Sequence, residues 1–342
     1  MTLKEIATKA GVSVTTVSRV LNQKSAKAAS LEVRNRIWKI AQENGYQPNK
    51  NAQLLRAPEN QQVKSGGKII CIYARNSLDI DSFFQTLTEA VEKECLKHGL
   101  IVSYTLKAKE LQDPLIKKII CDKSIQGFVV LGRCDKDLPE LLSKITNNVV
   151  YASMNQLPTD ENDQVICDGY NAGLTIMDSF ISNGKNKIAY IGDTHNEARF
   201  QAYLDGLKRA GLDYRPSLVY DSRITSEGGF TGTNNILSEH PDTDAIFCMG
   251  DVLAIGAIKS AQNFGKIVGK DISILSVDDI DVAQYITPCL STIHVPIVSM
   301  GECAVKLLAD RICGGHSIPI KCILPFSLVE RETFTSNISR ND

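Results

Sequence analysis

The sequence predicts a small all-α head of the helix-turn-helix type, followed by a larger α/β body built on parallel sheets. Three observations predict this class. Residues 1–48 carry helical apolar periodicity with polar turns between the helices. Residues 58–67 are polar and end in two glycines, as linkers do. From residue 68 onward, apolar runs of strand length alternate with helical stretches, and this part of about 275 residues is long enough for two lobes.

The head carries the signals of three successive helices. Thr2 and Glu5 have the spacing of a capping box, so the first helix is expected to begin directly after Thr2. Gly11 makes a tight turn, Ser13 can cap the second helix, and the third helix follows Ser30. The apolar positions expected to face inward are Leu3, Ile6, Ala7, Ala10, Val17, Val20, Leu21, Val33, Ile37, Ile40 and Ala41. Helix, short turn with glycine, helix is the pattern of a DNA-binding helix-turn-helix.

The charge is distributed unevenly along the chain. Residues 1–68 contain 12 Lys or Arg and 4 Asp or Glu, a net charge of +8. The whole chain carries −1, so the remainder carries −9. A polyanion would attract the head and repel the body, and its binding would be sensitive to salt. A merely solvated basic surface is the alternative, but the charge and the helix pattern together indicate DNA binding.

Four stretches of the head resemble the signature of the lactose/galactose repressor family, and the similarity continues to about residue 334. The stretches are Leu3-Lys4-Glu5-Ile6-Ala7, Ala10-Gly11-Val12-Ser13, Thr16-Val17-Ser18-Arg19-Val20-Leu21-Asn22 and Gly45-Tyr46-Gln47-Pro48-Asn49. Other stretches resemble the galactose-repressor branch, related to the evolved β-galactosidase repressor; they are 83–84, 91–95, 126–133 and 283–288. The resemblance implies a dimeric repressor of sugar-utilisation genes that binds palindromic operator DNA. It also implies control by a small sugar, a galactoside or a related hexose, and no cofactor.

The second helix is the one that enters the major groove in this family. By resemblance, Val14, Thr15 and Arg19 read the bases, and the guanidinium of Arg19 can pair bidentately with guanine O6 and N7. The polar side chains around them are suited to phosphate oxygens, which fix the register without reading sequence. These phosphate candidates are Ser13, Thr16, Ser18 and Asn22.

Residues 49–57 are a short helical candidate that ends before Pro58. Nine residues are too few for a stable isolated helix, so the segment needs a partner to order it. The resemblance implies a hinge that folds on the operator, with Asn49 and Ala52 at the DNA and Leu55 inserted into the minor groove. A plain linker is the alternative.

The body contains continuous apolar runs, which are typical of strands covered on both faces and therefore of parallel sheets. The runs are 69–73, 127–131, 149–152, 188–192, 245–248 and 272–277. Ligands of such folds bind beyond the carboxyl ends of the strands. The resemblance implies two doubly wound lobes, like a periplasmic sugar-binding protein, with a ligand cleft between them and chain crossings near 186, 293 and 323. The expected parts are a head at 1–48, a hinge and linker at 49–67, an amino-terminal lobe at 68–186 and 294–323, and a carboxyl-terminal lobe at 187–293 and 324–335.

Four side chains are the candidates for effector binding. By resemblance, Asp168, Arg199 and Asp278 match sugar-contacting positions, and Arg133 is an additional candidate. Carboxylates and guanidinium groups can bind vicinal hydroxyls bidentately. The alternatives are a helix cap for Asp168 or Asp279, and a solvated loop arginine for Arg133.

Two positions depart from the family pattern. Asn51 stands where a small apolar residue is usual, so hinge–hinge packing is expected to be weaker or to use a hydrogen bond. Met249-Gly250-Asp251 stands where Asn-Asp commonly follows a strand, so the effector contact there is expected to differ.

Other chemistries lack their sequence signals. The ten cysteines are scattered singly, so no metal site is expected, and reduced thiols together with DNA binding indicate a cytoplasmic protein. No nucleotide-binding glycine loop, catalytic triad or membrane-length apolar run is present. A sugar-acting enzyme with an accessory head is the alternative, but it needs paired acid–base groups. Asp278 and Asp279 are sequence neighbours, so in a loop they are expected to diverge rather than cooperate. Residues 330–342 are too short and too polar for a zipper that would join dimers, so a homodimer is expected.

Overall fold

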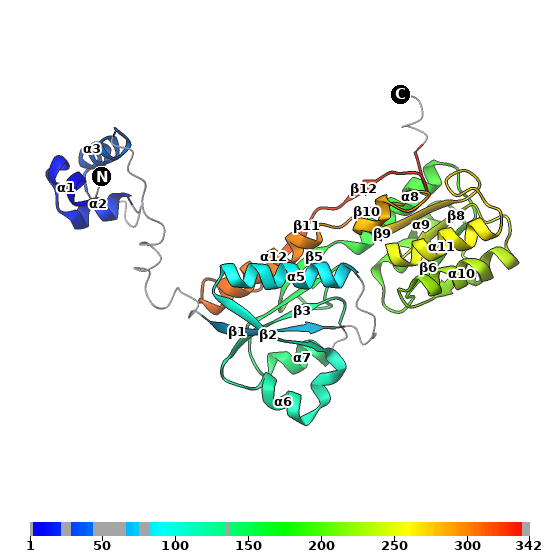
Figure 1. The fold of residues 1–342 in the computed structure, drawn as a ribbon, viewed down its shortest axis with the longest axis horizontal. Coiled ribbons are helices and arrows are strands. Elements are labelled where there is room, and N and C mark those ends of the chain that lie inside the picture. The colour runs from blue at the N-terminus through cyan, green and yellow to red at the C-terminus, as the bar shows by residue number, and fades with distance from the viewer. Residues whose placement is uncertain (1–2, 22–28, 44–65, 75–81, 135–136, 337–342) are drawn as a thin grey trace. The chain divides into compact units, whose positions relative to one another are not determined.

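The computed structural model describes residues 3–21, 29–43, 66–74, 82–134 and 137–336, and it divides into two compact units, a head (1–62) and a body (63–342) (Figure 1). Asn22 and the hinge candidates Asn49, Asn51, Ala52 and Leu55 lie outside the described residues.

The head is a bundle of three helices, α1 (Leu3–Ala10), α2 (Val14–Leu21) and α3 (Leu31–Glu43), each of which packs on the other two. Gly11 turns the chain at φ +64°, and the Val12 amide donates to Ala7 O at 3.1 Å. Ser13 Oγ caps α2 by accepting from the Thr16 amide at 3.1 Å. The buried core is Ile6, Ala7, Ala10, Val17, Val20, Ile37 and Ala41. The predicted helix-turn-helix is therefore confirmed.

The first lobe of the body is built on a six-stranded parallel sheet of order β11-β5-β4-β3-β1-β2. Its strands are β1 (Gly67–Tyr73), β2 (Leu100–Lys107), β3 (Ile125–Leu131), β4 (Val149–Ser153), β5 (Asp163–Cys167) and β11 (Lys321–Leu324). Its helices are α5 (Ser82–Lys97), η2 (Ala108–Gln112), α6 (Pro114–Ile120), α7 (Asp137–Ser143) and α12 (Ile297–Ile312). In β1, Ile69 and Cys71 join the core under α5 and α12, whereas Ile70 and Ile72 join the core with α6 and α7. Because alternate residues face opposite sides, a strand covered on both faces needs a continuous apolar run.

The second lobe contains a six-stranded sheet of order β12-β10-β9-β8-β6-β7, parallel except for the pairing of β12 with β10. Its strands are β6 (Ile188–Gly192), β7 (Val219–Asp221), β8 (Ala245–Cys248), β9 (Ser273–Asp278), β10 (Ser291–His294) and β12 (Ser327–Val329). Its helices are α8 (Gly169–Ser182), α9 (Ala198–Arg209), η3 (Pro216–Leu218), α10 (Ser226–Glu239), α11 (Asp251–Asn263) and η4 (Asp281–Gln284). Helix α8 packs on α9, and α10 packs on α11 (Figure 1). The expected body of two doubly wound lobes is confirmed.

The chain crosses between the lobes three times. Strand β5 belongs to the first sheet, but α8 packs on α9, β8 and β9, so the first crossing precedes Gly169 rather than lying near 186. Apolar packing places α8 on the second lobe: Phe180 of α8 is fully buried, and the centroid of its ring lies 5.9 Å from that of Phe334. The second crossing lies between β10 and α12, and the third between β11 and β12. No helix among the described residues is long and apolar enough to cross a membrane.

Candidate functional site

The amino-terminal end of α2 presents candidate DNA-reading residues to solvent. Val14 is 42% exposed although it is apolar, and Thr15 is exposed beside it. Ser13 Oγ lies 2.9 Å from Thr16 Oγ1, so these two candidates also stabilise the start of the helix. Arg19 lies one turn after Thr15 on the same helix, which places the two positions on one face. The side chains of Ser18 and Arg19 are outside the described part of the chain.

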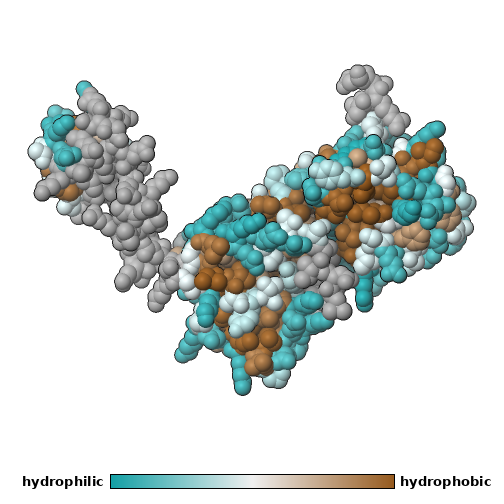
Figure 2. Space-filling view, viewed as in Figure 1, coloured by the Kyte–Doolittle hydropathy of each residue, from teal (hydrophilic) through white to brown (hydrophobic). Residues whose placement is uncertain are grey.

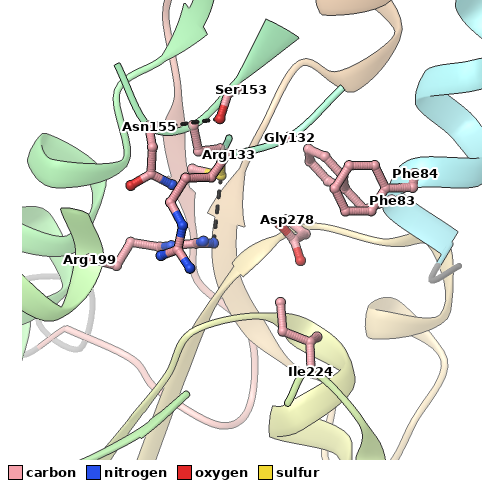
Figure 3. Close-up of a pocket in the computed structure, with 10 residues that line it drawn as sticks. Phe83, Phe84, Gly132, Arg133, Ser153, Asn155, Arg199, Ile224 and Asp278 are labelled. Atoms are coloured by element: carbon pink, nitrogen blue, oxygen red, sulfur yellow. Dashed lines mark hydrogen bonds between the residues drawn. The ribbon is translucent and has the colours of Figure 1, made fainter. Parts of the chain in front are cut away.

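A pocket between the two lobes brings together three of the four effector candidates: Arg133, Arg199 and Asp278. It is lined by Phe83, Phe84, Gly132, Arg133, Ser153, Met154, Asn155, Arg199, Ile224 and Asp278. Figure 3 shows both guanidinium groups on one side, the phenylalanine rings on the other and the Asp278 carboxylate between them. The pocket lies beyond the carboxyl ends of β3, β4 and β9, as expected for ligand sites in parallel sheets.

Phe84 reaches this pocket because Gly132 has no side chain. A Cβ at Gly132 would lie 2.9 Å from Phe84 Cζ, and φ is +92° there. The rings of Phe83 and Phe84 meet edge to face with centroids 5.3 Å apart. Together they form an apolar wall opposite charged groups.

Arg199 is a buried cation, only 4% exposed. Its Nε donates to Glu197 Oε1 at 2.7 Å, and its Nη1 donates to Met249 O at 3.0 Å. Burial lowers the pKa of Arg199, but the neighbouring Glu197 carboxylate outweighs this and raises it above the ordinary value. The guanidinium is therefore a fixed positive charge at the pocket.

Glu197 is bound from both lobes. Its Oε1 accepts from the amide and Nε of Arg199, at 3.2 and 2.7 Å. Its Oε2 accepts from Arg133 Nη1 at 3.0 Å and from Asn155 Nδ2 at 3.3 Å, both in the first lobe. Burial raises the pKa of Glu197, but the two arginines outweigh it and lower the pKa to about 2. The carboxylate is therefore ionised at neutral pH.

Arg133 spans the gap between the lobes. Besides Glu197, it forms an ion pair with Asp193 and donates to Asn196 O at 3.2 Å. Its side chain is only 19% exposed, so the alternative of a solvated loop arginine is wrong.

The fourth effector candidate, Asp168, does not line this pocket. Its carboxylate caps α8 by accepting from the Asn171 amide at 3.0 Å and from Asn171 Nδ2 at 2.7 Å. The helix-cap alternative therefore describes the geometry of Asp168.

Gly250 lies beside the carboxylate of Asp278, in a space that a larger side chain would fill. A Cβ at Gly250 would lie 3.0 Å from Asp278 Oδ2. The following Asp251 is fully buried and accepts from Ser276 Oγ at 2.5 Å and Thr292 Oγ1 at 2.6 Å. Thus Asp251 links β9 and β10 of the second sheet, and Gly250 places no side chain against the Asp278 carboxylate.

The pocket is small in this structure, with a volume of about 30 Å³. This is room for about two water molecules, whereas sites for small molecules hold about 300 Å³ or more. A wider groove of about 800 Å³ lies next to it, and Arg133 and Asn155 line both. Together with Glu197, which lines the groove, they form the wall between the two spaces.

Several lining residues were not among the sequence candidates. Ser153, Met154 and Asn155 follow the predicted strand at 149–152, so their place at a strand end could have suggested them. Phe83 and Ile224 carry no such signal, because apolar side chains in a pocket and in a core look alike in sequence.

Asp193, His195 and Asp221 each offer a possible metal ligand within 4.8 Å of one another. These groups already have partners: Asp193 binds Arg133 and the His195 amide, and Asp221 accepts from Thr194 Oγ1 at 2.9 Å. The cluster therefore stabilises a turn of the second lobe.

Comparisons with known proteins agree with this architecture. Residues 2–49 match the family described as "Bacterial regulatory proteins, lacI family", and residues 177–334 match the "Periplasmic binding protein-like domain". The chain is 28% identical to the HTH-type transcriptional repressor PurR of Escherichia coli O139:H28, over 97% of this chain and 96% of that repressor.

Two solved structures share the fold. The complex of the transcriptional regulator CelR with cellobiose is 24% identical, with a TM-score of 0.71, over 97% of this chain and 99% of CelR. The lac repressor dimer bound to operator and the anti-inducer ONPF is 22% identical, with a TM-score of 0.65, over 98% and 99% of the chains. The head thus matches the lacI family of bacterial regulatory proteins and the body matches the periplasmic binding protein-like domain, which together support a DNA-binding transcriptional regulator with a ligand-binding body.

Proposed function

We propose that a small sugar, a galactoside or a related hexose, binds in the interlobe pocket and controls the binding of a homodimer to a palindromic operator. The observation that carries this proposal is the placement of Arg199 and Asp278, both nearly buried, in one pocket. A guanidinium offers donors and a carboxylate offers acceptors, and vicinal hydroxyls need both. The wall of Phe83 and Phe84 suits the apolar face of a sugar ring.

The choice of a sugar also has support from relatives. CelR, which shares this fold, was solved as a complex with cellobiose. The narrower choice of a galactoside rests on the resemblance of stretches such as 126–133 and 283–288 to the galactose-repressor branch.

On the DNA side, we assign base reading to Val14, Thr15 and Arg19. The exposure of Val14 and Thr15 at the start of α2 supports this, because an apolar side chain at the surface of a basic head suits a thymine methyl group. The phosphate contacts assigned to the head are Ser13, Thr16, Ser18 and Asn22, and the minor-groove contacts assigned to the hinge are Asn49, Ala52 and Leu55.

A homodimer fits the symmetry of a palindromic site, since one recognition helix reads one half-site. The related lac repressor is a dimer on its operator. In this chain, large apolar side chains such as Leu96, Tyr285 and Ile323 are at least 64% exposed, and Figure 2 shows apolar surface, in brown, on the body. Apolar surface of this kind is what a partner subunit would cover.

The proposal is tested by a thermal-shift screen of the full chain with galactose, a β-galactoside, glucose, cellobiose and a hexose phosphate. The screen is repeated with an operator duplex selected from a random pool. A galactoside should raise the unfolding temperature of the wild type but not of Asp278→Ala. If no neutral sugar shifts the wild type, the sugar proposal is wrong.

A further inference from the structure

A buried carboxylate, that of Glu197, is bound from both lobes. The side chain of Glu197 has no exposed surface, and its two oxygens serve different lobes. Oε1 binds Arg199 of its own lobe, and Oε2 binds Arg133 and Asn155 of the other lobe. Asn155 also accepts from the Ala198 amide at 2.9 Å, which adds a second contact between the lobes at the start of α9.

These contacts lie between the effector pocket and the groove beside it. Arg133 and Asn155 line both the pocket of about 30 Å³ and the neighbouring groove of about 800 Å³. The smaller space is below the volume that sites for small molecules have. Separation of the lobes would remove the wall by breaking the bonds of Arg133 and Asn155 to Glu197, and it would leave Glu197 bound to Arg199.

The same carboxylate orients Arg199. The Nε–H and the backbone amide of Arg199 both donate to Glu197 Oε1, which directs the guanidinium toward Met249 O and the pocket. A buried charge that loses its partner is strongly destabilised, so loss of the Glu197 carboxylate would destabilise the present positions of both Arg133 and Arg199.

We propose that Glu197 is the positioning residue that couples effector binding at Arg199 to closure of the lobes through Arg133 and Asn155. The role of Glu197 in effector binding rests on the proposed function, whereas its role in lobe closure concerns the body alone. Of the contacts of Glu197, lobe opening breaks those of Oε2, whereas the position of Arg199 depends on those of Oε1. One residue therefore holds the effector-binding arginine in place and senses whether the lobes are closed.

The variants Arg133→Gln and Glu197→Gln separate these two roles. Arg133→Gln removes the ion pairs of Arg133 with Glu197 and Asp193 and leaves the Glu197–Arg199 pair, whereas Glu197→Gln weakens the pairs of Glu197 with Arg133 and Arg199. Arg215→Gln is the matched control, because Arg215 is exposed in the second lobe and does not line the pocket. Circular dichroism checks folding. If Glu197→Gln does not fold, lobe closure is measured in Arg133→Gln and Asn155→Ala instead.

Lobe closure is measured by energy transfer between fluorescent unnatural amino acids at two exposed positions, Lys117 of α6 and Glu239 of α10. Without any effector, Arg133→Gln and Glu197→Gln should lengthen the distance between the labels, and Arg215→Gln should not. The double variant should open the lobes by less than the sum of the two single variants, because both changes remove the Arg133–Glu197 pair, although Arg133→Gln also removes the pair with Asp193. An unchanged distance in both single variants would overturn the coupling, whatever the effector is.

Effector affinity gives the second readout. For the sugar identified by thermal shift, Glu197→Gln should weaken binding by about tenfold or more, and Arg133→Gln should weaken it less. Equal weakening would overturn the positioning of Arg199 by Glu197. If the variants open the lobes but no sugar binds the wild type, the proposed effector is wrong and the closure role of Glu197 stands.

Discussion

Asp278 and Asp279 are neighbours in the chain, yet their carboxylates serve different sites. Asp278 is 7% exposed and lines the interlobe pocket. Asp279 instead accepts from Arg331 Nη2 at 2.7 Å and lies 2.9 Å from His294 Nδ1. Hydrolysis of a glycosidic bond needs two carboxylates that flank it, and this pair does not supply them. Of the two carboxylates, that of Asp278 lines the interlobe pocket.

Arg19→Ala should abolish the preference of the repressor for its operator and keep much of the affinity for random DNA. A bidentate arginine–guanine pair contributes about 1–3 kcal/mol per half-site, whereas phosphate contacts are unaffected. Fluorescence anisotropy with operator and scrambled duplexes measures the ratio. Arg36→Ala, which removes an exposed charge on α3, is the control and should lower both affinities alike. A retained operator preference in Arg19→Ala would show that Arg19 does not read a base.

Leu55→Ala should weaken operator binding and reduce the bend of the DNA. An apolar side chain inserted between base pairs unstacks a step, and the bend allows further contacts. Circular permutation of the operator in gel-shift assays measures the bend, and the unfolding temperature of the body should stay unchanged. The same bend angle in wild type and variant would refute insertion of Leu55.

Gly250→Ala should weaken binding of the effector without unfolding the body. The added Cβ would lie 3.0 Å from Asp278 Oδ2, so the carboxylate must shift. The backbone can accept alanine, because φ is −154° and therefore extended. A change of about one methylene in a binding pocket costs about 1–3 kcal/mol, and isothermal titration calorimetry with the sugar measures it. Unaltered affinity would mean that the ligand does not use this side of Asp278.

Arg311→Leu should destabilise the first lobe by about 3 kcal/mol, because Asp163 would remain buried without its main partner. The two residues form two bonds of 2.5 and 2.7 Å between α12 and the start of β5. Chemical denaturation of the full chain measures the loss, and Arg215→Leu is the exposed control, expected to change little.

The same pair predicts a pH dependence. Burial raises the pKa of Asp163, but the bonds from Arg311, His316 and the Ile320 amide outweigh it and hold the pKa below its ordinary value. The folded state therefore binds the proton more weakly than the unfolded state. The stabilisation is present above pH 3.8 and is lost as pH falls through the lowered pKa. Arg311→Leu should reduce the fall of the unfolding free energy with decreasing pH in the acid range. A fall as steep as in the wild type would contradict the role of the pair.

The sequence predicted the parts of this molecule whose signals are local. Ser13 predicts the start of a helix because its side chain can cap one, and a continuous apolar run such as 188–192 predicts a strand with both faces covered. Helix α8 was expected in the first lobe because its sequence shows an apolar face but not which lobe that face packs on. The three-dimensional contact with α9 decides this.

The candidate site was predictable where resemblance supplied positions, and less so where it depended on geometry. Arg199 and Asp278 meet in one pocket, but Asp168 caps a helix at the end of a neighbouring strand. Glu197 precedes Arg199 by two residues, and nothing in that spacing shows that its second oxygen reaches the opposite lobe.

The most direct test of ligand-controlled DNA binding is to titrate the effector against the repressor–operator complex in the wild type, Arg199→Ala and Asp278→Ala. Effector should change operator affinity in the wild type, while both variants should fold and bind nonspecific DNA as before and ignore the effector. If it is an inducer, both variants should stay on the operator at effector concentrations that release the wild type. If it is a co-repressor, both should fail to gain operator affinity. A response of either variant at wild-type effector concentrations would contradict the assignment of that residue to the effector site.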